Sequence, residues 1–74
     1  MIRYVLVLKY GVEPNLDGHG SQISALGFDR SRIRQWTDDG TRDGYLVEAD
    51  PKLDIGRIKR ALPYIDSVIP DPNV

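Results

Sequence analysis

The sequence predicts an α+β fold of the ferredoxin-like type, a βαββαβ plait with a four-stranded antiparallel sheet and two helices on one face. Three observations lead to this prediction. The chain opens with an apolar, β-branched run, its middle alternates with period two around an Asp/Gly-rich loop, and a helical repeat precedes a short apolar end. Each crossover is long enough for a helix, which places the first and third strands at the centre of the sheet.

The first strand is expected over residues 2–10, where β-branched, leucine and tyrosine residues are concentrated. Alternate residues from Tyr4 to Leu8 share one face, and Val5 and Val7 lie on the other. Because both faces are apolar, we expect a central strand that is covered on both sides.

A short first helix is expected over residues 21–26, after a loop over residues 11–20 that is rich in turn formers. Ser21 or Asp17 is the expected N-cap, and Gly27 is the expected left-handed residue at the helix end. The helix is expected to span about two turns.

Residues 32–49 are expected to form a β-hairpin, because both arms alternate with period two. Asp39-Gly40 and Asp43-Gly44 both offer a turn residue that tolerates positive φ, so the register stays open by about two residues. Alternating oxygen-bearing residues in the loop are also similar in spacing to a calcium-binding loop. We favour an ordinary turn, since the loop leads into strands rather than helices.

A second helix is expected after Asp50-Pro51, a pair typical of an N-cap followed by proline at the first helical position. Ile55 and Ile58 begin an apolar repeat on one face, and the ring of Pro63 ends the helix.

The last strand is expected over residues 67–69. The domain organisation that follows is a single ferredoxin-like domain over residues 1–69 and a loose C-terminal tail over residues 70–74.

Length and composition limit the functional classes. A chain of 74 residues forms one small core, so we expect self-association or a partner that covers more of its surface. The absence of cysteine excludes a disulfide framework, a thiolate metal site and a cysteine nucleophile. No run approaches the roughly 20 apolar residues of a membrane helix, and no secretory signal is recognisable, so we expect a cytoplasmic protein without membrane contact. We expect no cofactor and no metal ion.

In the predicted plait, one face of the sheet is left open. Placing the residues from Tyr4 to Leu8 against the helices gives this open face an apolar centre, a basic rim and one tryptophan, which is typical of a contact surface. The expected partner-binding residues are Arg3, Val5, Val7, Lys9, Arg32, Arg34 and Trp36.

His19 is the only histidine. A catalytic base needs a nearby nucleophile and a group that orients it, and the sequence offers no such constellation. We therefore expect a solvated loop histidine and a protein that is not an enzyme.

The leading functional hypothesis is a small non-enzymatic interaction module, an adaptor, inhibitor or accessory subunit. It would bind a protein partner or a second copy of itself through the open sheet face or an exposed strand edge. The alternative is a single-stranded nucleic-acid or RNA-binding module. Arg32, Arg34 and Trp36 share a strand face, and guanidinium groups beside an indole can hold phosphates and stack a base.

One family resemblance rests on segments that run through most of the chain. These are Asn-Leu-Asp-Gly-His-Gly at residues 15–20, Ala-Leu-Gly-Phe at 25–28, Tyr-Leu-Val-Glu-Ala at 45–49 and Val-Ile-Pro-Asp at 68–71. Together they resemble PurS, the small accessory subunit of formylglycinamidine ribonucleotide synthetase in bacterial purine synthesis. The resemblance implies a non-catalytic, dimerising subunit that bridges a glutaminase to the ATP-using synthetase.

Overall fold

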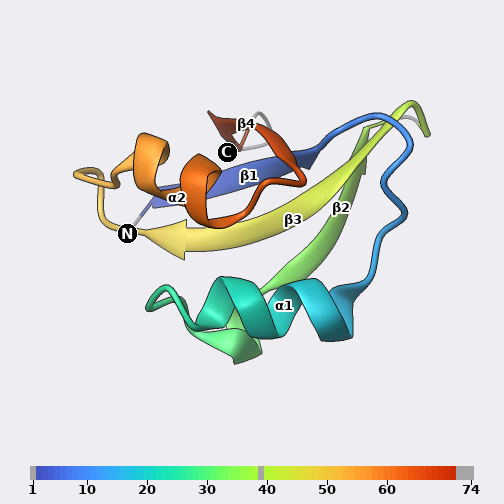
Figure 1. Cartoon of the computed structure of the whole chain (residues 1–74). Helices are drawn as coiled ribbons and strands as arrows, with labels where there is room; N and C mark the ends of the chain where they lie inside the picture. Colours follow the sequence, from blue (N-terminus) through green and yellow to red (C-terminus); the bar gives the residue numbers. More distant parts are fainter. Residues whose placement is uncertain (1, 39, 72–74) are drawn as a thin grey trace.

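The computed structural model describes residues 2–38 and 40–71. These residues form one sheet with two α-helices packed against it (Figure 1). In chain order the elements are β1 (Ile2–Leu8), α1 (Leu16–Ser24), the short 3₁₀ helix η1 (Arg30–Arg32), β2 (Arg34–Asp38), β3 (Arg42–Ala49), α2 (Ile55–Ala61) and β4 (Ile65–Pro70). The strand order is β2-β3-β1-β4, and all neighbouring strands are antiparallel. The predicted plait is therefore confirmed, with β1 and β3 at its centre.

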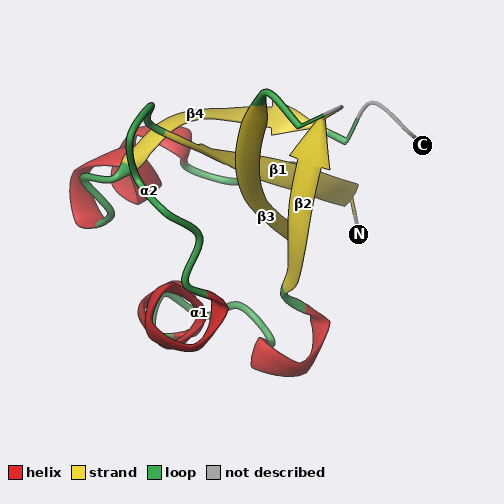
Figure 2. Ribbon diagram, turned by 90° about the vertical axis from the view of Figure 1, so that its right-hand side faces the viewer, coloured by secondary structure: helices red, strands yellow, loops and turns green. Residues whose placement is uncertain are grey.

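The hydrophobic core lies between the sheet and the two helices, which cover the same face (Figure 2). Tyr4, Leu6 and Leu8 of β1 contribute to this core, as predicted, and meet Ile23 of α1 and Ile58 of α2. Leu6 and Ile23 are completely buried. We call this side of the sheet the covered face and the opposite side the open face.

The strands β1 and β3 come unusually close at Gly44, which lies opposite Val7 on one side and Trp36 on the other. A Cβ at this position would lie 2.5 Å from the carbonyl oxygen of Leu6, so only glycine fits here. Asp43-Gly44 is therefore part of β3. The hairpin turn is at Gly40, whose φ is +83°, and Asp39 lies outside the described residues.

Helix α1 begins five residues earlier than predicted. Its N-cap is Asn15, whose Oδ1 accepts a hydrogen bond from the backbone N of Gly18 at 3.0 Å, and neither Ser21 nor Asp17 has this role. Gly18 and Gly20, which suggested a loop, are helical, and Gly20 is buried. The Nε of Arg30 lies 2.8 Å from the position that a Cβ of Gly20 would take, so a side chain at this position would displace the Arg30 guanidinium. The predicted left-handed residue, Gly27, has φ +106°.

Helix α2 also has a different N-cap from the predicted one. Asp54 accepts from the backbone N of Arg57 at 3.0 Å, whereas Asp50 accepts from Lys52 N at 2.8 Å in the preceding turn. Ile58 is buried, whereas Ile55, the first residue of the helix, is 41% exposed. The prediction that Ile55 faces the core was wrong.

The last strand is longer than predicted, and the predicted tail starts too early. Pro70 belongs to β4, and the backbone N of Asp71 donates to the carbonyl oxygen of Arg3 at 2.9 Å. The side chain of Asp71 is 3% exposed. Backbone pairing with β1 thus orders the chain through Asp71, and the rest of the predicted tail, residues 72–74, lies outside the described residues.

Candidate interaction surface

Strand pairing arranges the residues of the open face in rows that run across the sheet. Residues directly opposite each other on antiparallel strands point to the same side. One row contains Arg34, Leu46, Val5 and Ile69, one from each strand. The next row begins with Trp36 and continues through Gly44, Val7 and Ser67.

A charged row lies on the other side of the Arg34 row, and we call it the charged ladder. It consists of Arg32, Glu48, Arg3 and Asp71. The Arg32 guanidinium lies 3.3 Å from Glu48 and 3.8 Å from Asp29, and Arg3 lies 3.9 Å from Asp71. Opposite charges therefore alternate across the ladder, and the two arginines have carboxylate partners within the chain.

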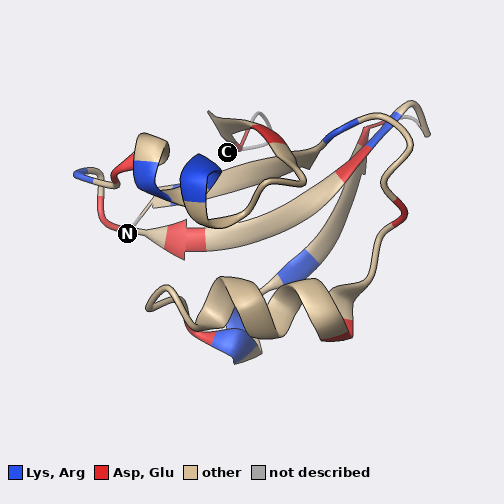
Figure 3. Cartoon of the chain, viewed as in Figure 1, with Lys and Arg blue, Asp and Glu red and all other residues tan. Residues whose placement is uncertain are grey.

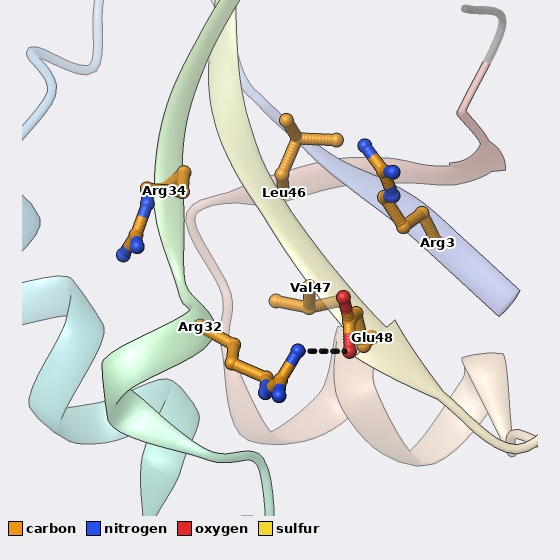
Figure 4. A pocket seen from close by; sticks show the side chains of 6 residues that line it. All are labelled: Arg3, Arg32, Arg34, Leu46, Val47 and Glu48. Atoms are coloured by element: carbon orange, nitrogen blue, oxygen red, sulfur yellow. Dashed lines mark hydrogen bonds and ion pairs between the residues drawn. The ribbon is translucent and has the colours of Figure 1, made fainter. Parts of the chain in front are cut away.

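A concavity of about 160 Å³ opens beside the ladder. It is lined by Arg3, Arg32, Arg34, Leu46, Val47 and Glu48. Figure 4 shows Arg3 on the β1 side and Arg34 on the β2 side, with Leu46 between them and Glu48 directed toward Arg32. The Arg3 and Arg32 guanidinium groups and the Glu48 carboxylate thus lie around an apolar floor, and Arg34 borders it from β2 with its guanidinium directed away from Leu46.

Arg34 differs from the other two arginines of the concavity. Its Nη1 donates to the backbone oxygen of Ser31 at 2.7 Å, a bond that directs the guanidinium toward η1 (Figure 4). Within residues 2–38 and 40–71, Arg34 forms no ion pair with a carboxylate. The side chain is exposed at the rim, where its remaining N–H donors can reach another molecule.

The predicted apolar centre of the open face is not accessible. Val5 is completely buried and Val7 is 5% exposed, although no helix among the described residues covers this side of the sheet. Their row neighbours include Leu46 and Ile69, of which Leu46 is half-buried and Ile69 is 37% exposed. The two valines are therefore not available for contact with a partner. The accessible apolar surface of the open face is formed by Leu46 and Ile69.

Two other predicted site residues are placed differently from expectation. Arg32 belongs to η1 rather than to a strand, although its side chain still reaches the concavity. Lys9 follows the far end of β1, about 20 Å along the strand direction from Arg3, and lines a separate hollow with Tyr10 and Arg42. The structure thus brings together Arg3, Arg32 and Arg34, and it separates Lys9 from them.

Trp36 lies on the open face of the edge strand β2, as predicted from the alternation, and is half-buried. Its direct neighbour on β3 is Gly44, which has no side chain, so the space beside the indole is not filled from that position. An edge strand also presents backbone groups that have no partner strand on their outer side. Trp36 and the β2 edge therefore border the same surface as Arg34.

Leu46 and Glu48 line the concavity but were not among the predicted site residues. The alternation of β3 already places both on the face opposite Tyr45 and Val47. Whether Leu46 and Glu48 line the concavity depends on which strands lie next to β3. The pairing of β3 with β1 cannot be predicted from local alternation. Asp71 was missed because prolines on both sides of it are typical of a loose tail.

His19 lies in α1 and is half-buried, so the expectation of a solvated loop residue was wrong. Its Nδ1 is 2.6 Å from the hydroxyl of Tyr45, and its ring stacks on Tyr64 at a centroid distance of 4.0 Å. The Tyr45 hydroxyl also accepts from the backbone N of Asn15 at 2.7 Å. Burial lowers the pKa of His19 and raises the pKa of Tyr45 and Tyr64. This polar cluster joins the start of α1 to the sheet and to the segment before β4.

Charges of both signs are interspersed over the described chain rather than separated onto different sides (Figure 3). No group of three or more histidine or acidic residues that could hold a metal ion is found within residues 2–38 and 40–71. The loop that is similar to a calcium site forms the β2–β3 turn, where the Thr41 hydroxyl donates to Asp38 Oδ1 at 2.8 Å. Within the same residues, no helix is long and apolar enough to cross a membrane.

Comparisons of the chain with protein-family models, with curated proteins and with solved structures found no match. The resemblance to PurS therefore stays a prediction. The candidate surface is defined by its geometry alone, as the part of the open face around Arg34, Leu46 and Trp36.

Proposed function

We propose that the protein is a small non-enzymatic interaction module that binds a protein partner, or a second copy of itself, through the open face of the sheet. The observation that carries this proposal is the concavity beside the charged ladder, where exposed arginines flank Leu46 without a covering helix. Arginine and tryptophan are the residue types that most often dominate binding energy in protein interfaces. A chain of this size also gains stability from any partner that covers apolar surface.

The surface suits recognition by contact rather than turnover of a small molecule. Its charged groups form salt bridges with each other at the ladder, and its apolar residues Leu46 and Ile69 lie in the neighbouring row. A polar rim around an accessible apolar strip is the usual arrangement in protein interfaces. In this proposal the module acts as an adaptor, inhibitor or accessory subunit of a larger protein.

The test is an affinity purification from the native host with the tagged full chain, followed by mass spectrometry, together with light scattering of the purified protein. We expect a specific partner or a dimer, and we expect Trp36→Ala to weaken it. Tyr10→Ala is the matched control, because Tyr10 is 80% exposed and lies next to Lys9, away from the candidate surface. Binding that is lost equally in both variants, or in neither, would contradict the proposal.

Nucleic acid is the second candidate partner, because Arg34 and Trp36 lie on the same face of β2, where a phosphate and a stacked base could be held together. This alternative predicts a gel shift with a single-stranded oligonucleotide that weakens steeply with salt and with substitution of Arg34. The absence of a shift at low salt would exclude it.

A further inference from the structure

The three arginines of the concavity are not equivalent, and the difference identifies where an anion would bind. Arg3 and Arg32 already contact carboxylates of the same chain, at 3.9 Å from Asp71 and 3.3 Å from Glu48. Arg34 has only a backbone carbonyl as its partner within the described residues. The charged ladder is therefore close to neutral, and one positive charge at the β2 rim remains for another molecule.

The guanidinium of Arg34 is also held in position before any ligand arrives. The 2.7 Å bond from its Nη1 to Ser31 uses one of five N–H donors and restricts the side chain. A planar guanidinium with free donors can bind a carboxylate through two parallel hydrogen bonds. Because part of the ordering cost is already met within the chain, less is lost when the ion pair forms.

The neighbours of Arg34 indicate what accompanies the anion. Leu46 is its direct neighbour in the row, and the row continues over buried Val5 to exposed Ile69. An apolar side chain placed next to an acidic one would therefore lie on Leu46. Glu48 lines the other side of the concavity and would repel a second negative group placed there.

We propose that the open face binds an acidic–apolar peptide segment of a protein partner, with a carboxylate on Arg34 and a neighbouring aliphatic side chain on Leu46. This inference rests on the proposed function and adds the chemistry of the partner to it. A nucleic-acid strand fits the surface less well, since it would place a row of phosphates along a ladder whose arginines are already neutralised by Glu48 and Asp71.

The experiment is selection of a random peptide library displayed on phage against the immobilised full chain. We expect the selected peptides to be enriched in Asp or Glu next to Leu, Ile or Val. Synthetic copies of these peptides should bind Arg34→Gln about tenfold more weakly than the unchanged protein, the loss expected for one charge-assisted contact. Lys9→Gln is the matched control, because it removes an exposed positive charge at the far end of β1.

Titration of the isotope-labelled protein by NMR then locates the site. The backbone amide signal of Leu46 and the Nε–H signal of Arg34 should shift with the selected peptide, and the Lys9 amide should not. Selected peptides without acidic residues, equal losses in Arg34→Gln and Lys9→Gln, or failure to select any peptide would each overturn the inference. Tighter binding of a ten-residue oligothymidine than of the peptides would overturn it in favour of nucleic acid.

The outcomes separate this inference from the proposed function. If peptides or a captured partner bind less well to Trp36→Ala but equally well to Arg34→Gln, the interaction module is supported and the acidic peptide segment is excluded. If neither a partner, a dimer nor a peptide binds, both hypotheses are wrong. Circular dichroism of Arg34→Gln shows that a loss of binding is not a loss of fold.

Discussion

The covered face and the open face of the sheet are built from alternate residues of the same strands, yet they bury their apolar groups in different ways. On the covered face Leu6 is buried by helices that pack against it. On the open face Val5 is equally buried without a helix, among row neighbours that include Leu46 and Ile69. Low exposure on this small sheet therefore has two origins. The helices bury the apolar side chains of the covered face. On the open face, Leu46 and Ile69 stay in contact with solvent beside the buried valines.

The strongest test of this comparison exchanges one leucine on each face for alanine. Leu6→Ala should lower the free energy of unfolding by about 3 kcal/mol, because the cavity it leaves in the closed core cannot collapse fully. Leu46→Ala should cost only about 1 kcal/mol, since half-buried Leu46 faces solvent on one side. Urea unfolding followed by circular dichroism measures both. Equal losses would show that the open face is part of the folding core.

A smaller effect is expected from pH, and it belongs to the covered face alone. Burial lowers the pKa of His19 below its ordinary value of 6.5, so the unfolded chain binds a proton more readily than the folded one. Stability from this group is complete above pH 6.5 and is lost as the pH falls below that value. The Tyr45 hydroxyl can donate to Nδ1 only while that nitrogen is unprotonated, so the loss should loosen the start of α1.

Urea unfolding at pH 7.5 and pH 5.5 measures this dependence, with His19→Gln as the variant that should remove it. The other described groups whose pKa values are shifted do not titrate between pH 5.5 and 7.5. Hydrogen bonds from Ser31 and Thr41 hold the pKa of Asp29 and Asp38, respectively, below the ordinary 3.8, so their contributions are lost only in stronger acid. If the free energy of unfolding of His19→Gln depends on pH as strongly as that of the unchanged protein, protonation of His19 is not the cause of the pH dependence.

The smallest effect on stability is expected at the residue that carries the proposed binding. Arg34→Gln should change the free energy of unfolding by less than about 0.5 kcal/mol, because the side chain is exposed and makes no ion pair within the described residues. The measurement is the same urea titration at pH 7.5. A loss as large as that of Leu46→Ala would assign Arg34 to folding rather than to recognition.

Periodicity was sufficient to predict the strand order, the central position of β1 and the face that Leu6 occupies, because these depend on alternation and on crossover length. The helix starts were harder to predict. Gly20 lies inside α1 with the Arg30 guanidinium where its Cβ would be, and local propensity contains no information on this contact between residues ten positions apart. In the same way, Asp71 joins the site only through its pairing with β1.

Of the candidate surface, the arginines and the tryptophan could be predicted from their place in the alternation. Their different ion-pair partners could not. Asp71 and Glu48, which pair with Arg3 and Arg32, come from segments far apart in the sequence, although Arg32 also lies near Asp29, three residues away. Arg34 forms no ion pair within the described residues. Lys9 is absent from the site for a related reason. Arg3 lies near the start of β1, whereas Lys9 follows its other end.

The close approach of Gly44 to the backbone of Leu6 limits which residues of this surface can change in evolution or in the laboratory. A side chain at position 44 would force β1 and β3 apart, so the sheet itself keeps a glycine opposite Trp36. The charged residues around the surface can be exchanged one at a time to alter which molecule is preferred, while the strand pairing stays the same. Variants with new specificity are therefore best sought at the rim, with residue 44 kept constant.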